Sequence, residues 1–446
     1  MLTSPSLFIQ PLDQLSLSPE QLIKQIERFS PCLMLRDQEN CTIGLFPNHY
    51  SLFQHNSLQH FERSSNYHHY IPTQQAPSIE LNEAQIEQTS EFRGGVMGFI
   101  SYDYAAQQHI SVNLKPQPAL FLGIFKTFLK QTVAGWEFHS LDIQAKEIYQ
   151  YFLTQLSQNS ASETPFKLTQ KCLARWSKAE YSQAFHKIQD YIVAGDCYQI
   201  NLTQEFIGTA QGRLSQTAEA FWDLTQAPYS AYLSVGEFEL LSCSPELFIE
   251  FQANRKILTK PIKGTMPRFE DFNLDEQSKQ KLKDSEKDMA ENVMIVDLLR
   301  NDLSLYAETG SVKTPKLFNI ESFNQVHHMV SEIEATLKPN ISPFDVLMSA
   351  LPGGSITGAP KIRAMQIIEE LEESPRGAYC GSLGYFNFDG TGSWNILIRS
   401  IQKYQEHISL WAGGGITIAS DCDAEYQECF DKIEAMLNLL NTWSDN

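Results

Sequence analysis

The sequence lacks the features that mark membrane, secreted and nucleic-acid-binding proteins. No apolar run approaches the roughly 20 residues that a membrane-spanning helix needs. Residues 1–5 have neither the basic region nor the apolar core of a signal peptide. The chain carries 34 Lys and Arg against 53 Asp and Glu, a net charge of −19, and no basic run offsets this charge. Because such a surface repels nucleic acid and anionic lipid, we expect a cytoplasmic protein with no nucleic-acid or membrane partner. An anionic substrate would require a local positive pocket.

Paired cysteines are also missing. The eight cysteines are scattered without a Cys-X-X-Cys pair, which favours reduced thiols over a disulfide framework or a zinc site. The chain does have 446 residues, 42% of them apolar, enough for a large core in one or two domains. Residues 157–164 are polar and precede Pro165, as is typical of a linker. We therefore predict an N-terminal part over 1–155, a linker over 156–176 and a C-terminal part over 177–437.

One lysine stands in a distinctive local pattern. Residues 247–251 form an apolar run and residues 254–255 a polar turn, which predicts a strand, a turn and a second strand that ends near Lys263. A lysine between a β-branched residue and a glycine can be held rigidly on one side and approached closely on the other. It could act as a nucleophile if burial or nearby cations lowered its pKa. The alternative is a solvated lysine at a strand end.

Two predicted helices each carry a row of charged side chains on one face. The first row is Asp284, Asp288 and Glu291, and the second is Glu425, Glu428 and Lys432. Aligned carboxylates on two helices could hold a Mg²⁺ ion that also touches a substrate oxygen. The alternatives are a solvated acidic face and an ordinary salt bridge between Glu428 and Lys432.

Two further segments could form a polar site. Residues 352–361 are rich in glycine and lead into a predicted helix, whose N-terminus would suit an anion. They lack the Gly-Lys-Ser/Thr of a nucleotide-binding loop, so a carboxylate ligand is favoured over a nucleotide. Residues 198–204 alternate as a strand with amide side chains on one face, which can be plain surface or the lining of a pocket.

Taken together, these segments resemble the chorismate-utilising enzymes. The motifs that carry the resemblance are Ser-Pro-Glu-Leu-Phe-Ile (244–249), Pro-Ile-Lys-Gly-Thr (261–265), Ala-Glu-Asn-Val-Met-Ile-Val-Asp-Leu (290–298), Val-His-His (326–328), the glycine-rich residues 352–361 and Ala-Glu-Tyr-Gln-Glu (424–428). The match runs from about residue 177 to 437, and is weaker before that. It is strongest with the aminodeoxychorismate synthase component I branch of the family, and next with the anthranilate synthase component I branch. The resemblance implies an α/β (α+β) fold, in which two antiparallel β-sheets pack as a sandwich with helices outside.

The resemblance also implies roles for individual residues. Glu291 and Glu428 would hold Mg²⁺ against the ring carboxylate of chorismate, and Glu246 would act as general acid and base near the departing hydroxyl. The residues expected around chorismate are Gln199, Gly264, Thr265, His328, Tyr379, Arg399, Gly415 and Lys432. Arg399 and Lys432 would supply the positive charge that an acidic protein needs to bind a dianion.

The lysine at 263 distinguishes the two branches. Aminodeoxychorismate synthases carry Pro-Ile-Lys-Gly-Thr, whereas anthranilate synthases carry alanine at the lysine position. The implied mechanism is attack of Lys263 on the ring at C2 with loss of the C4 hydroxyl, followed by ammonia attack at C4 and expulsion of the lysine. Relatives that use water place a lysine base where this chain has Gln199, so the resemblance favours ammonia as nucleophile.

A partner and a second ligand are implied in the same way. Ammonia would come from a separate glutamine amidotransferase subunit in a heterodimer, because the length leaves no room for a fused glutaminase domain. Relatives carry a run ending in serine at a tryptophan site, where this chain has Met-Leu-Arg-Asp ending at Asp37. Tyr229, Ser230 and Ala231 match the other half of that site. The competing hypotheses are anthranilate synthase component I, a non-catalytic binding protein of the same fold and a pyridoxal phosphate enzyme with a lysine Schiff base.

Overall fold

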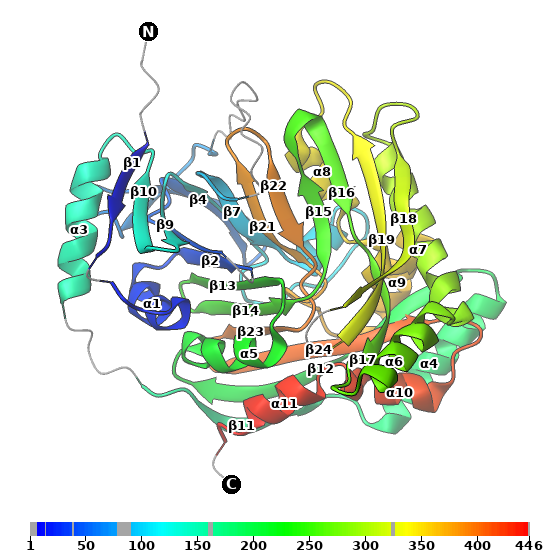
Figure 1. Ribbon diagram of the computed structural model, residues 1–446. Coiled ribbons are helices and arrows are strands. Elements are labelled where there is room, and N and C mark those ends of the chain that lie inside the picture. Colours follow the sequence, from blue (N-terminus) through cyan, green and yellow to red (C-terminus); the bar gives the residue numbers. More distant parts are fainter. Residues whose placement is uncertain are drawn as a thin grey trace.

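Two large antiparallel β-sheets form the body of the protein (Figure 1). The computed structural model describes residues 7–13, 15–37, 40–77, 91–158, 164–322 and 326–444. Neighbouring strands of the first sheet run in the order β1 (Phe8–Pro11), β10 (Gly135–Ser140), β9 (Thr127–Thr132), β3 (Cys41–Leu45), β2 (Cys32–Arg36), β13 (Tyr229–Val235), β14 (Phe238–Ser244), β23 (Ser400–Tyr404), β24 (His407–Ile416), β12 (Gln199–Gln211) and β11 (Lys167–Ala174), and β20 (Gly358–Ala359) also pairs with β12.

The second sheet is built in the same antiparallel manner. Its order is β17 (Ile262–Pro267), β19 (Val326–Thr336), β16 (Lys256–Thr259), β15 (Leu247–Phe251), β22 (Gly392–Asn395), β21 (Ser382–Asn387), β7 (Gly95–Ile100), β8 (Leu120–Phe125), β4 (His49–Gln54), β5 (Ser57–Arg63) and β6 (Tyr70–Thr73), and β18 (Lys313–Ser322) also pairs with β19. Every pairing in both sheets that lies within the described residues is antiparallel, as hairpin-rich connections favour.

A hydrophobic core joins the two sheets. Leu33 and Leu233 from the first sheet and Phe121 from the second are fully buried in one cluster. Phe99 of β7 stacks on Phe238 of β14 with their ring centroids 5.3 Å apart. Each such side chain contributes about 1.5–3 kcal/mol when it leaves water, so this layer fixes the sandwich that the sequence predicts.

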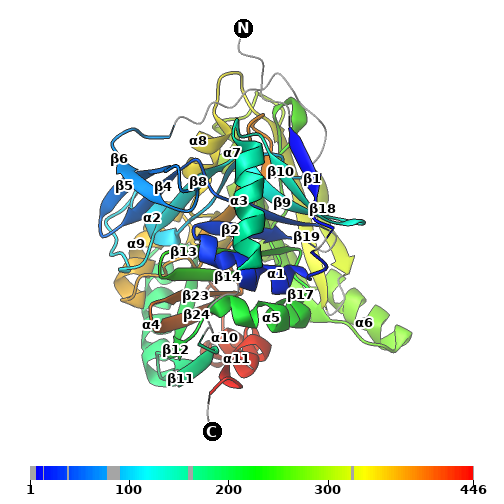
Figure 2. The same ribbon diagram turned by 90° about the vertical axis from the view of Figure 1, so that its left-hand side faces the viewer.

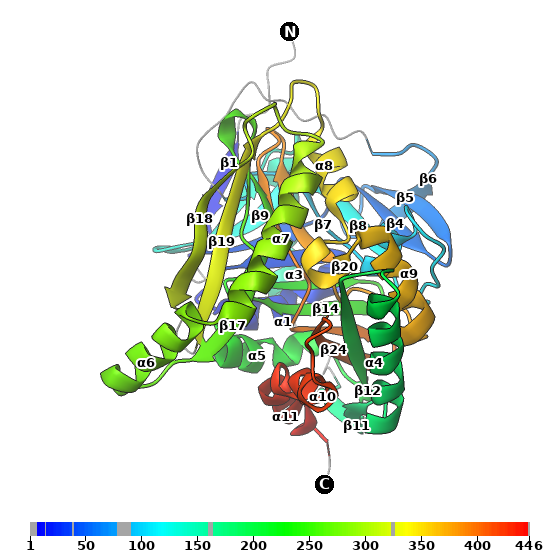
Figure 3. The same cartoon turned by 90° about the vertical axis from the view of Figure 1, so that its right-hand side faces the viewer.

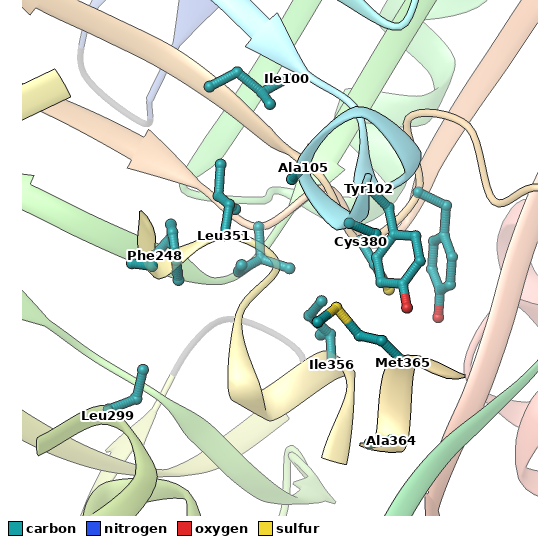
Figure 4. Close-up of a cluster of buried hydrophobic side chains, with 14 of the residues drawn as sticks. Ile100, Tyr102, Ala105, Phe248, Leu299, Leu351, Ile356, Ala364, Met365 and Cys380 are labelled. Carbon is teal, nitrogen blue, oxygen red and sulfur yellow. The ribbon is translucent and has the colours of Figure 1, made fainter. Parts of the chain in front are cut away.

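Helices cover the outer faces of the sandwich. On the first sheet lie α1 (Pro19–Ile26), α3 (Ala145–Ser157), α5 (Ala218–Thr225) and α11 (Glu434–Asn441) (Figure 2). On the second sheet and the end of the first lie α2 (Tyr102–Ala106) (Figure 2) and α4 (Lys178–Val193), α7 (Glu286–Ser304), α8 (Pro343–Ala350) and α9 (Lys361–Glu372) (Figure 3). Figure 4 shows part of the core beneath them, which includes Phe248, Leu351, Ile356 and Met365, with Leu299 of α7 at its edge. The predicted fold class is therefore confirmed.

The N- and C-terminal parts of the chain share both sheets. β2 pairs with β13, and β7 pairs with β21. Strand β11 lies inside the predicted linker 156–176, and residues 159–163 of that linker are outside the described residues. The division into 1–155 and 177–437 stays a prediction about the chain, while in space the two parts build one sandwich.

Local signals in the sequence account for several helix ends. The side chain of Ser177 accepts a hydrogen bond from the backbone N–H of Glu180, whose carboxylate accepts one from the N–H of Ser177. This reciprocal cap starts α4 where the sequence predicts it. No helix in the described part of the chain is long and apolar enough to cross a membrane.

The acidic segment from Asp284 differs from the prediction of one continuous helix. Asp284 is the C-terminal cap of α6 (Phe272–Lys283), and α7 begins after a new cap at Ser285. The carboxylate of Asp284 accepts hydrogen bonds from Gln280 at 2.7 and 2.8 Å. Only Asp288 and Glu291 of the predicted acidic row therefore share a helix.

Candidate active site

A cavity of about 810 Å³ lies where β17 and β19 of the second sheet meet β24 of the first, beside α7 and α10 (Cys422–Asp431). Figure 1 shows β17, β24 and α10 gathered in this corner of the sandwich. The predicted site residues that line the cavity are Glu246, Lys263, Gly264, Thr265, Glu291, His328, Tyr379, Arg399, Gly415, Glu428 and Lys432. The fold thus brings together side chains from widely separated parts of the chain.

A break in strand register directs Lys263 into the cavity. Ile262 pairs with Val330 and Thr265 with His328, so β17 has one residue more than β19 between these pairs. Such a bulge turns a side chain that regular pleating would place elsewhere. Gly264 in the bulge has φ +79°, and a Cβ there would lie 2.8 Å from the Asp288 carboxyl carbon. Only glycine fits this position without strain.

The amine of Lys263 lies near both acidic and basic side chains but forms no close contact with any of them in the described part of the chain. The structure shows no hydrogen bond or ion pair for it among the described residues, and the half-buried side chain faces the cavity. Burial lowers the pKa of Lys263, and nearby Lys432 lowers it further, while Glu291 and Glu246 oppose the shift. A lysine held nearer neutrality is a better nucleophile than a solvated one, so the alternative of a solvated strand end does not describe this residue.

Glu246 occupies the tight connection between β14 and β15. The residue is 7% exposed. Burial raises the pKa of Glu246 to about 7, against the opposing effects of Lys263 and of a hydrogen bond from the backbone N–H of Ile262. A carboxyl group that titrates near neutral pH can both donate and accept a proton.

The two predicted metal ligands face the cavity from different helices, Glu291 from α7 and Glu428 from α10. Burial raises the pKa of Glu291. Burial acts in the same direction on Glu428, but the Lys432 ammonium, 2.6 Å away, outweighs it and lowers the pKa of that carboxyl group. The salt bridge from Glu428 to Lys432 that the sequence offered as an alternative is therefore present.

The acidic residues do not form a ready-made metal cage. Over the described residues, no group of three or more His, Cys, Asp or Glu side chains is arranged as a metal-binding cluster. Mg²⁺ commonly takes only one or two protein carboxylates and fills its other positions with water and substrate. Glu291 and Glu428 would supply two carboxylates, which fits this coordination. Binding of Mg²⁺ by these two residues stays a prediction.

Arg399 supplies an uncommitted positive charge. Its backbone has φ +49°, its side chain lines the cavity, and burial lowers the pKa of its guanidinium. The structure pairs it with no carboxylate in the part of the chain that it describes. A planar guanidinium in this state is suited to bind an anionic ligand in two-pronged fashion.

His328 and Thr265 form a neutral pair in the cavity lining. Thr265 Oγ1 lies 2.8 Å from His328 Nδ1, across the register of β17 and β19. Burial and the Arg399 charge lower the pKa of His328 to about 4. The imidazole is therefore uncharged at neutral pH and can exchange hydrogen bonds with a ligand without adding charge.

Gln199 is the one predicted substrate residue outside the lining. It starts β12, next to β24, and a side chain on Gly415 would overlap its amide. The amide of Gln199 thus fills the space beside Gly415 where a Cβ would lie. In the glycine-rich residues 352–361, Ser355 lines the cavity, while Lys361 pairs with Asp302 at 2.9 Å.

The sequence did not single out two other lining residues. Asn201 lies on the amide-bearing strand that was predicted either to be surface or to line a pocket. Trp411 lies beside three glycines and stacks on Tyr379, with ring centroids 5.8 Å apart and planes 11° apart. The sequence pointed to these two residues through their neighbours alone, namely the amide-bearing strand for Asn201 and the three glycines for Trp411.

A second, smaller cavity of about 250 Å³ lies between the sheets, near the junction of β2 and β13. Asp37, Tyr229, Ser230 and Ala231 all line it. The two halves of the predicted tryptophan site are therefore adjacent in space. Its occupancy by tryptophan stays a prediction.

Gly264→Ala is expected to lower kcat/KM for the reaction at this site by about 10²-fold. The new Cβ would clash with Asp288, and relief of that clash must displace Lys263. The matched control is Gly310→Ala, since Gly310 also has φ +79° but a Cβ there would touch nothing within 4 Å. Both variants share the backbone strain of about 1–2 kcal/mol. Urea unfolding and steady-state kinetics separate the two effects, and equal kinetics for both variants would contradict this account of the bulge.

Comparison with known proteins agrees with the site. The family described as chorismate binding enzyme matches residues 30–438. The chain is 42% identical over 358 residues to aminodeoxychorismate synthase component 1 of Salmonella typhimurium (78% of this chain, 77% of the relative). It is 41% identical over 356 residues to the protein of that name from Klebsiella aerogenes (79% and 78%).

A solved structure shares the fold. Anthranilate synthase component I from Streptococcus pneumoniae superposes with a TM-score of 0.73 at 23% identity, over 90% of this chain and 92% of that one. The predicted resemblance is confirmed by these matches together. The chain belongs to the chorismate binding enzyme family.

Proposed function

We propose that this protein acts as component I of an aminodeoxychorismate synthase, converting chorismate and ammonia into 4-amino-4-deoxychorismate for para-aminobenzoate and folate synthesis. The observation that carries the proposal is the position of Lys263, which lines the cavity at a β-bulge and whose pKa is lowered by burial. The names of the relatives at 42% and 41% identity support it.

The proposed chemistry uses Lys263 and Glu246 in two allylic displacements. The neutral Lys263 amine forms a bond to C2 of the ring, both conjugated ring double bonds shift, and the C4–O bond breaks. Glu246 donates the proton with which the hydroxyl leaves as water. Ammonia then forms a bond to C4, both ring double bonds shift back, and the C2–N bond to Lys263 breaks. Glu246 takes up the proton that ammonia loses, and the enolpyruvyl group is retained.

The charge balance of the cavity supports a requirement for Mg²⁺. Its lining, within the described residues, carries six carboxyl groups against four Lys and Arg side chains. A dianion would be repelled by such a surface unless a divalent cation offset the excess. Glu291 and Glu428 would hold this ion, which would neutralise the ring carboxylate of the substrate, while Arg399 would bind its other carboxylate.

The source of ammonia is proposed to be a glutamine amidotransferase subunit that forms a heterodimer with this chain. The names of the relatives call each of them component 1, which implies a second component for those proteins. We further propose that the pair works in the cytoplasm. All eight cysteines are free thiols in the structure, as expected for a reducing compartment.

Identification of the product tests this proposal. The purified chain is incubated with chorismate, ammonium and Mg²⁺. The products are then separated by chromatography and identified by mass spectrometry. We expect 4-amino-4-deoxychorismate with no release of pyruvate. Fluorescent anthranilate with stoichiometric pyruvate would show the sister reaction instead. Chorismate left unchanged would favour a binding protein, and a yellow cofactor reducible by borohydride would favour a pyridoxal phosphate enzyme.

Removal of Mg²⁺ with a chelator is expected to abolish turnover, and re-addition to restore it. Glu291→Gln should raise the Mg²⁺ concentration for half-maximal rate by at least about tenfold, because one ionised ligand is lost. Glu286→Gln, in an exposed position on the same helix, is the control and should leave this concentration unchanged. Turnover that is indifferent to the chelator would refute the proposed metal.

A further inference from the structure

A buried ion pair lies directly behind the wall of the cavity. Arg376 and Glu372 are each 1% exposed. Two nitrogens of the guanidinium, Nε and Nη2, donate to the two carboxylate oxygens of Glu372 at 2.8 Å each. Neither residue lines the cavity and the proposed chemistry uses neither.

The pair is bonded to the backbone of two lining residues. Arg376 Nη2 donates to the carbonyl of Asn201 at 2.7 Å, and Nη1 donates to the carbonyl of Ile356 at 2.9 Å. The side-chain amide of Asn201 also donates to the Ile356 carbonyl, at 3.0 Å. One guanidinium thus joins β12 of the first sheet to the glycine-rich segment before α9, and both strand and segment face the substrate side.

The same guanidinium is flanked by aromatic rings. Its central carbon lies 4.6 Å from the ring centroid of Tyr102 and 5.9 Å from that of Tyr379, a lining residue. Tyr379 in turn stacks on Trp411, and Lys115 lies 5.3 Å from the Trp411 ring. Tyr379 and Trp411 therefore stack between two cations, Arg376 and Lys115, and this stack holds the plane of Tyr379.

The N-terminal part of the chain closes this arrangement from outside. The carboxylate of Asp103 accepts hydrogen bonds from the backbone N–H of Arg376 at 3.1 Å and of Gly377 at 2.8 Å. The Gln402 amide donates to the carbonyl of Arg376 at 3.0 Å. Glu372 is held as well, because its Oε1 accepts from both the N–H and the hydroxyl of Thr203.

Stability alone is a poor reason to bury these charges. A buried ion pair loses hydration, and replacement by apolar groups of similar volume is often neutral or stabilising. The fixed, forked geometry of a guanidinium instead serves to hold several acceptors in one arrangement. In this protein those acceptors are two backbone carbonyls of the cavity wall.

We propose that Arg376 and Glu372 are positioning residues for chorismate, which fix Asn201, Ile356 and Tyr379 as one rigid wall against the substrate. The inference rests on the proposed function, since it assigns the substrate of the same cavity. It also gives the N-terminal part of the chain a role in the site, through Tyr102 and Asp103.

The decisive variant removes both charges together. In Glu372→Gln/Arg376→Met the glutamine oxygen can still accept the Thr203 bonds, and no unpaired charge is left buried. We expect the double variant to fold and to raise KM for chorismate so that kcat/KM falls by about 10²-fold. Arg376→Lys keeps the charge beside Glu372 but loses the fork, and should raise KM less.

The matched control is Glu239→Gln, in a buried charge cluster away from the cavity. Glu239 is fully buried and lies 3.4 Å from both Arg213 and Lys403. Loss of stability alone reduces the folded fraction, which lowers kcat and leaves KM unchanged. We therefore expect Glu239→Gln to leave KM for chorismate unchanged.

The outcomes are read against the unaltered protein, with each variant assayed at a temperature below its own thermal unfolding transition. If the unaltered protein forms no 4-amino-4-deoxychorismate, the proposed function itself is overturned. Two results would overturn only the inference while the unaltered protein still forms product. One is an unchanged KM for chorismate in the double variant, and the other is an equal rise of KM in Glu239→Gln. Should the double variant not fold, Arg376→Lys decides in the same way, through its KM.

Discussion

Lys263→Ala is expected to reduce formation of 4-amino-4-deoxychorismate by at least about 10³-fold, because the residue that forms the covalent bond at C2 is lost. The protein should remain folded, since burying an amine near other cations costs free energy that alanine does not. Product formation is measured by chromatography and mass spectrometry, and folding by urea unfolding.

The control for this variant lies three residues away, in the short connection between β16 and β17. Lys260 is 31% exposed in its side chain and pairs with Glu332 at 3.1 Å, outside the cavity. Lys260→Ala should keep full turnover. A Lys263→Ala variant that still forms the 4-amino product at a comparable rate would remove the lysine from the mechanism.

Glu246→Gln is expected to have opposite effects on activity and on stability. Turnover should fall by about 10²–10⁴-fold, because proton transfer at C4 is lost. The folded-state pKa of Glu246 is about 7 against an ordinary 4.5, so the protonated form favours folding. This contribution is complete below pH 4.5 and is lost as pH rises through 7.

At pH 8 the glutamine variant should therefore have the larger free energy of unfolding, by roughly 3 kcal/mol at about 1.4 kcal/mol per pKa unit. At pH 4.5 the two proteins should be nearly equal. Urea unfolding at both values measures the difference, with Glu237→Gln, at an exposed turn position, as control. A stability difference that does not change with pH would contradict the assignment of a raised pKa to Glu246.

The site could be predicted from the sequence where short motifs carry the chemistry. Lys263, Glu246 and Glu428 each lie in a local pattern that specifies both residue type and neighbours, and all three line the cavity. The β-bulge at Gly264 could not be predicted, because register depends on the partner strand β19. The orientation of Lys263 follows from that register and not from its own segment.

Other features depend on contacts between distant segments. Asp284 was expected on the helix of Glu291, but a new cap at Ser285 ends that continuity. Gln199 was expected in the lining but is not among the lining residues, and its side-chain amide fills the space beside Gly415 where a Cβ would lie. Arg376 gives no signal in the sequence, since its partners come from β12, α2 and α9.

The measurement that tests the central claim most directly is the intact mass of the protein after incubation with chorismate and Mg²⁺ in the absence of ammonia. We predict an added mass equal to chorismate less one water, located on Lys263 by peptide mapping, absent from Lys263→Ala and discharged as 4-amino-4-deoxychorismate when ammonia is added. Protein that stays unmodified under these conditions, yet still makes this product once ammonia is present, would contradict a covalent role for Lys263.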